Sequence, residues 1–352
     1  MNKQPNIIWE RGSAYDLFVS LRVIHTPEEF GLRPSWAAGV RSRLPTRLRD
    51  ALEASQKFLK VPLSFIHSLS EPKDAGTALT ALEALSPEDR LPAIFFGTKN
   101  NPETQHDLGF LSSLTGKKRL SASITEQIRQ TYTNPHQVTK ERVRAAFEAW
   151  SDRSTFGDMF VQALKSYTNN FFLEEETRII PAHAKAINQA QILAKGTDVL
   201  TLLEKLSAGV RMDWIEEVSN LVLAPSFWGA PFVFFDTLDD ETGIILFGSR
   251  PKSMTLVPGD LVPEALLNAL KALADPTRLS ILRYLLEGPR SPSELARILR
   301  LRPPTVIHHL QNLRLAGLVF VTVSPQSERR YAVRMDGVNS TANQLNMFLS
   351  GD

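Results

Sequence analysis

The sequence predicts an α+β protein, in which a mainly helical N-terminal domain with a small antiparallel meander precedes a C-terminal domain of helices and one hairpin. Apolar residues recur with helical spacing over most of the first part of the chain, and three short apolar runs between 220 and 248 are typical of strands. After Pro263, caps, prolines and glycines delimit regular short elements. We expect the domains to cover 1–255 and 256–352.

The bulk composition indicates a packed protein without disulfide or thiolate chemistry. The chain has 352 residues, 43% of them hydrophobic, and contains no cysteine, which excludes disulfides, thiolate metal sites and cysteine nucleophiles and fits a reducing cytoplasm. The first residues lack the apolar core of a signal peptide. The longest uncharged apolar run, 218–235, is interrupted by Pro225, Gly229 and Pro231. We therefore expect a cytoplasmic protein that does not associate with membranes.

The N-terminal domain is expected to begin with a short strand in "NIIWER" and to continue as a series of helices. These helices are predicted over 13–25, 35–59 with a break at Pro45, 74–85, 121–132, 137–150, 154–172, 174–195 and 197–207. Strands are predicted at 220–224, 231–236 and 243–248. The stretch 250–263, which carries three prolines, is the expected junction to the C-terminal domain.

Capping signals define the first helices of the C-terminal domain. A helical stripe covers 264–273. Asp275 is a good N-cap for the next helix, with Pro276 at its first position and Gly288 beyond its end. Ser291 is expected to cap a third helix and to form a capping box with Glu294.

The stretch "RPPTVIHHLQNLRLAGLV" predicts the helix that follows. Pro303 and Pro304 fit a first helical turn, where a missing N–H costs nothing. Val306, Leu310 and Leu313 form the expected buried stripe. We place this helix at 303–316, followed by a hairpin over 318–334 and a last helix over 337–349.

This order of elements is that of a winged helix-turn-helix, in which the second helix of the pair enters the DNA major groove and the hairpin, or wing, reaches the flanking backbone. Adjacent residues of a helix lie about 100° apart, so His308 and His309 do not converge on one metal ion. His309 is expected beside the buried stripe. His308 is expected on the opposite side with Thr305 and Gln311, where polar side chains contact bases or phosphates.

Basic residues are concentrated in the same segment. The chain as a whole has a net charge of +2, but residues 290–334 carry eight arginines, no lysine and two acidic residues. From charge alone, two interpretations remain open: a solvated basic face, or a surface that contacts phosphates.

The segments "LKALADPTRLSILRYLLEG", "SPSELARILRLRPPTVIHHLQNLRLAGLV" and "RRYAV" resemble the ArsR-type winged-helix transcriptional regulators of bacteria over about a quarter of the chain. The resemblance implies a homodimeric repressor that binds double-stranded DNA at an inverted repeat and releases it when a signal binds. It also implies a dimer built mainly from the helices near 264–273 and 338–349.

The residues expected to contact DNA lie in the second helix of the pair, just before it, and in the wing. They are Arg300, Arg302, Thr305, Ile307, His308, Gln311, Arg314, Arg329 and Arg330. The chain departs from the family at Ile307, where serine is usual, and before the helix, where arginines and proline replace glycine and serine-glutamine, so base preference does not carry over. Metal-sensing members of the family carry cysteines in the first helix of the pair, where this chain has Ser291, Pro292 and Ser293. Others carry aspartate and histidine in the last helix, where this chain has Asp336 but no histidine. We therefore expect no metal site.

The stretches "YDLFVSLRVIHTPEEFGLRPSW" and "LVLAPSFWGAPFVFF" resemble a subset of ArsR-type regulators with a long N-terminal domain of uncharacterised function. The resemblance implies a regulatory or dimerising module and supplies no ligand. We expect this domain to sense a non-metal signal, such as a small-molecule effector, or a partner.

No catalytic motif is recognisable in the N-terminal domain, and we expect neither an enzyme nor a cofactor. The alternative is an N-terminal enzyme or binding module with an appended DNA-targeting winged helix. Arg41, Arg43, Arg47 and Arg49 cluster around Pro45. They form either a solvated helix face or a site that binds an anion or extends the DNA contact.

Overall fold

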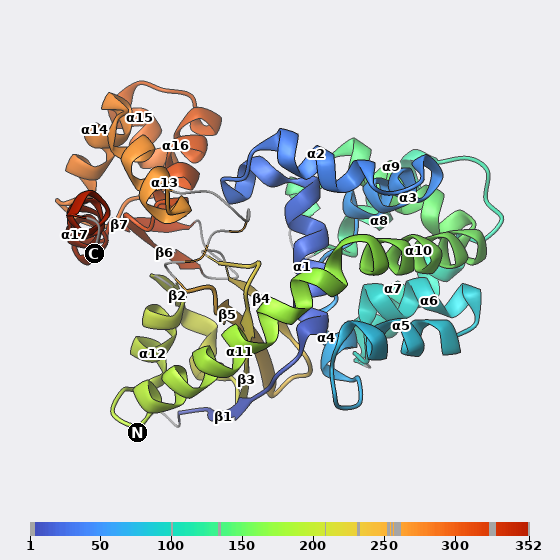
Figure 1. Ribbon diagram of the computed structural model, residues 1–352. Helices are drawn as coiled ribbons and strands as arrows, with labels where there is room; N and C mark the ends of the chain where they lie inside the picture. The colour runs from blue at the N-terminus through green and yellow to red at the C-terminus, as the bar shows by residue number, and fades with distance from the viewer. Residues whose placement is uncertain are drawn as a thin grey trace.

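The computed structural model describes residues 4–99, 101–132, 135–207, 209–230, 233–251, 254, 256, 262–323 and 329–350, and it is an α+β fold (Figure 1). The helices are α1 (Ser13–His25), α2 (Pro34–Ser42), α3 (Thr46–Gln56), α4 (Leu63–His67), α5 (Ala75–Ala84), α6 (Pro87–Phe96), α7 (Pro102–Ser112), α8 (Ala122–Gln130), α9 (Lys140–Ser151), α10 (Arg153–Tyr167), α11 (Leu173–Ala194), α12 (Val199–Leu206), α13 (Glu264–Leu273), α14 (Pro276–Leu285), α15 (Pro292–Leu299), α16 (Pro303–Leu315) and α17 (Met335–Ser350). The strands are β1 (Asn6–Trp9), β2 (Val210–Met212), β3 (Asn220–Ser226), β4 (Phe234–Thr237), β5 (Thr242–Gly248), β6 (Val319–Val323) and β7 (Arg330–Val333).

The helices predicted from sequence periodicity are confirmed, including the break at Pro45 between α2 and α3. The helices α4, α6 and α7 are not predicted by the periodicity, because α4 is only five residues long and proline or glycine interrupts the apolar spacing of α6 and α7. The predicted junction at 250–263 lies largely outside the described residues. No helix in the described ranges combines the length and the apolar composition needed to cross a membrane.

One long helical segment connects the two halves of the molecule. A π-helical turn at Thr168–Phe172 joins α10 directly to α11, and the two helices cross Figure 1 as a continuous diagonal. Residues of α10 and the first half of α11, as far as Ala182, belong to one apolar core. From Ile187 onward, α11 belongs to a second core. The segment is therefore a shared support for both cores.

A four-stranded sheet in the order β1-β3-β5-β4 separates the two cores. Because side chains alternate along a strand, Val222 and Ala224 of β3 face the first core, which the helices α1 to α10 dominate. Leu221 and Leu223 face the second core, and all four side chains have an exposed fraction of 0%. The sheet is therefore buried on both faces.

The prediction of a small antiparallel meander is wrong for this sheet. β1 and β5 both run parallel to β3, and only β4 is antiparallel, to β5. The physical reason is visible in the sequence. A meander with one face in water alternates apolar and polar residues, whereas 221–224 and 244–247 are uninterrupted apolar runs, as in parallel strands buried on both faces.

The C-terminal elements form a helical unit closed by a three-stranded sheet in the order β2-β6-β7. β6 and β7 are the predicted antiparallel hairpin, whose tip at 324–328 lies outside the described residues. The third strand, β2, comes from residues 210–212 and pairs in parallel with β6. The second apolar core also continues from α11 and α12 into α14, α15 and α16, so it crosses the boundary that we predict at 255/256.

Candidate nucleic-acid interface

The pair α15–α16 is held by local caps that the sequence predicts. Ser291 accepts from the Glu294 N–H at 3.2 Å while the Glu294 carboxylate accepts from the Ser291 N–H at 2.7 Å, which completes the capping box. Asp275 caps α14 by accepting from the Arg278 N–H at 2.9 Å. These caps fix the starts of α14 and α15, and α16 packs against both helices.

The buried stripe of α16 is the predicted one. Val306, Leu310 and Leu313 each have an exposed fraction of 0%. His309 lies beside them with a side chain 14% exposed, and its Nδ1 is 3.9 Å from an Asp275 carboxylate oxygen. Burial lowers the pKa of His309 below its ordinary value, against the opposing effect of Asp275. His309 therefore supports the packing of α16 on α14, as the sequence indicates.

The opposite side of α16 is exposed to solvent and carries four of the predicted site residues together. They are Thr305, Ile307, His308 and Gln311. The Asn312 amide donates to the His308 carbonyl at 3.0 Å and lies 3.2 Å from His308 Nε2, which orients the imidazole. Ile307 is 41% exposed, so an apolar side chain stands among the polar ones. We call the row Thr305, His308, Gln311 the reading row.

The turn between α15 and α16 places two more predicted residues, Arg300 and Arg302, in solvent. Arg300 is the C-cap of α15 and has φ 56, in the left-handed region. It is the only residue other than glycine with a positive φ in the described ranges. Such a backbone costs an L-residue about 1 kcal/mol, and strain of this kind is often retained at functional positions.

Arg314 does not lie where the sequence predicts. It is only 5% exposed, and its Nη2 donates to the Ser207 carbonyl at 2.9 Å. Burial lowers the pKa of the guanidinium to about 10, so it remains charged at neutral pH. The reason is its helical position: Arg314 follows Leu310 by four residues and thus falls on the buried side of α16. In this structure it holds the protein together and does not face DNA.

The wing residues Arg329 and Arg330 are both exposed. Arg330 Nη2 donates to the Pro289 carbonyl at 2.7 Å and lies 3.4 Å from a Glu294 carboxylate oxygen, so this arginine also ties β7 to the turn before α15. Its side chain is still 50% exposed. Both arginines are thus exposed to solvent, and Arg330 lies next to α15.

Sequence reasoning missed the residues that anchor the wing strand β6 from the N-terminal side. The Val321 N–H donates to the Gly209 carbonyl at 3.0 Å, and a Cβ on Gly209, whose φ is +98, would lie 2.6 Å from the Phe320 ring. Glycine is therefore required for this close approach. These contacts join segments more than a hundred residues apart, and no local pattern in the sequence predicts such a pairing.

The described residues hold no group of three or more histidine, aspartate or glutamate side chains arranged to bind a metal ion. His308 and His309 have ring centroids 6.2 Å apart and point to different surroundings. The chemistry of this surface is accordingly that of guanidinium, imidazole, amide and hydroxyl groups.

We predict that replacing Arg300 with glycine stabilises the protein. Arg300→Gly removes the left-handed strain, whereas Arg300→Ala removes the same charged side chain and keeps the strain. Urea denaturation followed by circular dichroism should show Arg300→Gly more stable than Arg300→Ala by about 1 kcal/mol. Equal stability of the two variants would contradict a strained cap.

Residues 275–320 match the model of the family described as bacterial regulatory protein, arsR family. The match runs from the N-cap of α14 through α15 and α16 into β6, and so contains the capped helix pair and the reading row. No curated protein and no solved structure matches the chain. Residues 275–320 are therefore an ArsR-type helix-turn-helix, the DNA-binding element of a transcription regulator.

Proposed function

We propose that the protein is a sequence-specific, homodimeric transcriptional repressor that reads an inverted repeat with α16 and contacts the flanking backbone with its wing. The observation that carries this proposal is the exposed reading row on α16, whose opposite side is buried against the rest of the protein. Side chains of these types recognise base edges and phosphates. Arg300, Arg302, Arg329 and Arg330, all exposed, surround the row with positive charge.

The test is DNA binding measured by fluorescence anisotropy on duplexes tiled across the upstream region of the protein's own gene. We expect one tile to bind more tightly than random DNA and its affinity to fall with salt. His308→Ala should weaken binding to that tile by about 1–3 kcal/mol and leave binding to random DNA nearly unchanged. Arg329→Ala should weaken binding to both duplexes and reduce the salt dependence.

His106→Ala is the matched control, because His106 lies on α7 with a side chain 84% exposed. It should change neither affinity. If His308→Ala bound the preferred tile as tightly as His106→Ala does, α16 would not be the helix that contacts the bases, which we call the reading helix.

The dimer that we propose uses α13 and α17, which pack against each other within the chain. Thr341 is the only buried residue among the described side chains of α17. Met347, Phe348 and Leu349 at the end of this helix are 57%, 42% and 73% exposed, and Leu270 of α13 is 36% exposed. An exposed apolar patch of this kind favours a protein interface, and a twofold axis would pair the patch with itself.

Sedimentation equilibrium should therefore give twice the mass of one chain. Phe348→Glu should shift the population to monomers because it buries a charge in the proposed interface. Asn346→Glu adds the same charge at a neighbouring exposed position of α17 and should leave the mass unchanged. A wild-type monomer at micromolar concentration would rule out this assembly.

We also propose that the N-terminal domain senses a small molecule or partner. A groove of about 450 Å³ lies between β1 and the end of α11, a volume typical of small-molecule sites. Its lining residues are Ile7, Trp9, Asn188, Gln191, Ile192, Ala194 and Lys195. Ile7, Trp9 and Ala194 pack on the same apolar core as α14 to α16. A ligand bound in the groove would therefore act on the reading helix through side chains that are in contact with one another.

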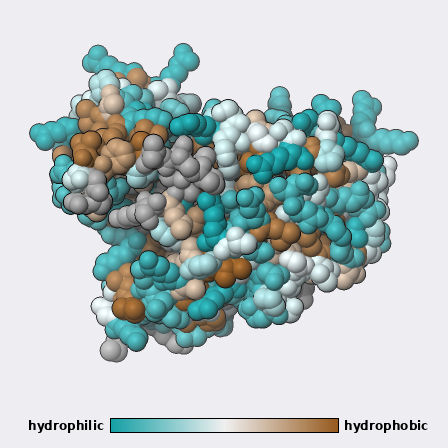
Figure 2. All heavy atoms as spheres, viewed as in Figure 1, coloured by the Kyte–Doolittle hydropathy of each residue, from teal (hydrophilic) through white to brown (hydrophobic). Residues whose placement is uncertain are grey.

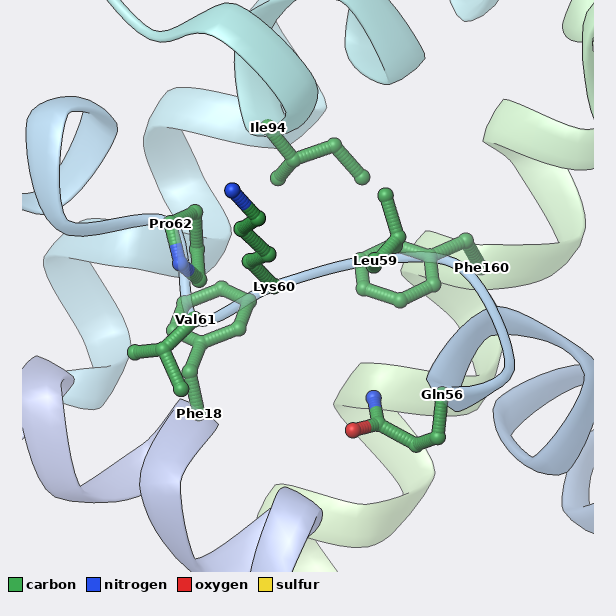
Figure 3. Close-up of a pocket in the computed structure, with 8 residues that line it drawn as sticks. All are labelled: Phe18, Gln56, Leu59, Lys60, Val61, Pro62, Ile94 and Phe160. Carbon is green, nitrogen blue, oxygen red and sulfur yellow. The ribbon is translucent and has the colours of Figure 1, made fainter. Parts of the chain in front are cut away.

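A second hollow is less suited to a ligand. Figure 3 shows Lys60 beside Phe18, Val61 and Pro62, with Ile94 across the space. The cavity measures about 10 Å³, room for about one water molecule. Burial lowers the pKa of Lys60, but a ligand would require the surrounding helices to separate.

We propose that the chain is not an enzyme. Asp16, His183 and Ser226 have the side chains of a hydrolytic triad, but their exposed fractions are 0%, 3% and 1%. The Ser226 hydroxyl donates to Asp16 at 2.6 Å, and His183 Nε2 contacts the same carboxylate at 2.7 Å. Since a nucleophile must donate to the base, this network supports a structural role. It ties α1 to α11 and to the turn after β3.

A further inference from the structure

The segment 30–49, which forms α2 and the start of α3, carries five arginines and no acidic residue. Three of these arginines are engaged by the protein. Arg41 Nη1 donates to the Ile24 carbonyl at 2.7 Å, Arg49 lies 3.4 Å from an Asp50 carboxylate oxygen, and Arg33 also has an interaction partner. Arg43 and Arg47, at the corner between α2 and α3, are exposed. Neither makes an ion pair with another residue in the described ranges.

The fold contributes no evident stabilisation for these two charges. Arg47 lies in the first turn of α3, which contains no acidic residue, and a cation there is disfavoured by the helix dipole. The nearby Arg41 and Arg49 are positive as well. A negatively charged partner outside the chain would therefore be favourable at this corner.

The chain just before α2 packs closely against α13 and α16. Gly31, with φ +75, approaches so closely that a Cβ would lie 2.7 Å from Asn268 Nδ2 and 3.0 Å from Leu315 Cδ2. Leu315 follows His308 by seven residues and Gln311 by four, so it extends the reading row at the C-terminal end of α16. α2 thus begins three residues after the chain contacts the C-terminal end of α16.

From that contact, α2 leads away along the side of the molecule on which α15 and α16 lie, the upper side in Figure 1. Figure 2 shows hydrophilic side chains projecting from the upper edge of both the winged helix and the part that contains α2 and α3. The nine residues of α2 span about 13 Å. This length corresponds to about four phosphates along one DNA strand.

We propose that Arg43 and Arg47 bind backbone phosphates of duplex DNA beyond the C-terminal end of α16 and so extend the footprint of each half-site outward. The inference rests on the proposed DNA-binding function and deepens it: the N-terminal domain is then part of the DNA-binding surface. The contact is to phosphates alone, so it adds affinity without base preference.

The test compares two duplexes: the operator alone, and the operator with about ten further base pairs on each side. The wild-type protein should bind the long duplex more tightly and with a steeper salt dependence. Arg43→Gln/Arg47→Gln should weaken binding to the long duplex about tenfold or more, and should flatten the salt slope by about 0.9 for each phosphate that the variant no longer neutralises. Its binding to the short duplex should equal that of the wild type.

The matched control is Lys118→Gln/Arg119→Gln, which removes the same charge from two exposed positions before α8. It should leave both affinities unchanged. Hydroxyl-radical footprinting should also show the protected region shortened at its outer ends in the Arg43/Arg47 variant only.

The inference would be overturned if the wild type bound both duplexes equally, or if the control variant lost as much affinity on the long duplex as the Arg43/Arg47 variant. If the wild type bound neither duplex better than random DNA, the proposed function itself would fail, and this inference with it. The wild-type measurement therefore separates the two failures.

Discussion

The placement of the reading helix depends on its attachment to residues 207–212. β2 extends the wing sheet by pairing with β6, and Arg314 of α16 donates to the Ser207 carbonyl over a separation of 107 residues. A guanidinium that is only 5% exposed needs such an acceptor, because a buried charge without partners is very costly. Residues 207–212 and α16 are therefore constrained to move together.

If the N-terminal domain senses a signal as we propose, this attachment is the physical route by which the signal reaches α16. The core that contains Val210 and Met212 continues through α11 and α12 on one side and through α14 to α16 on the other. A change in the packing of α11 is thus transmitted through close-packed side chains, which tolerate little deformation. Coupling of this kind is reciprocal: a ligand that changes the affinity for DNA by a given factor has its own affinity changed by the same factor when DNA is bound.

The sequence predicts the local elements well and their long-range assembly poorly. Asp275, Ser291 and Glu294 act within three residues of their partners, and the ArsR-type motif carries the order of the helices, so the reading row follows from helical spacing alone. Arg314 shows the limit. Its position on the buried side of α16 follows from the spacing to Leu310, but the carbonyl that makes its burial tolerable lies in a segment that no local signal connects to α16.

The sheet shows the same limit at a larger scale. The apolar runs at 221–224 and 244–247 indicate strands, but strand order and direction depend on which segments meet, and β1 joins β3 across more than two hundred residues. A wing sheet with a third strand from outside the winged helix is likewise a tertiary feature. Pairing partners of this kind leave no periodicity in the sequence.

Hydrogen–deuterium exchange of the full chain, with and without saturating operator DNA, tests most directly whether the reading helix and the N-terminal domain act as one unit. Because residues 207–212 are attached to α16 and to the wing, we expect DNA to slow exchange both in α16 and in the peptide that spans β2, which lies outside the proposed DNA contact. Arg314→Met should reduce the effect on β2, whose pairing with β6 remains, while leaving that on α16. Slower exchange confined to α16 and the wing in the wild type would contradict the coupling.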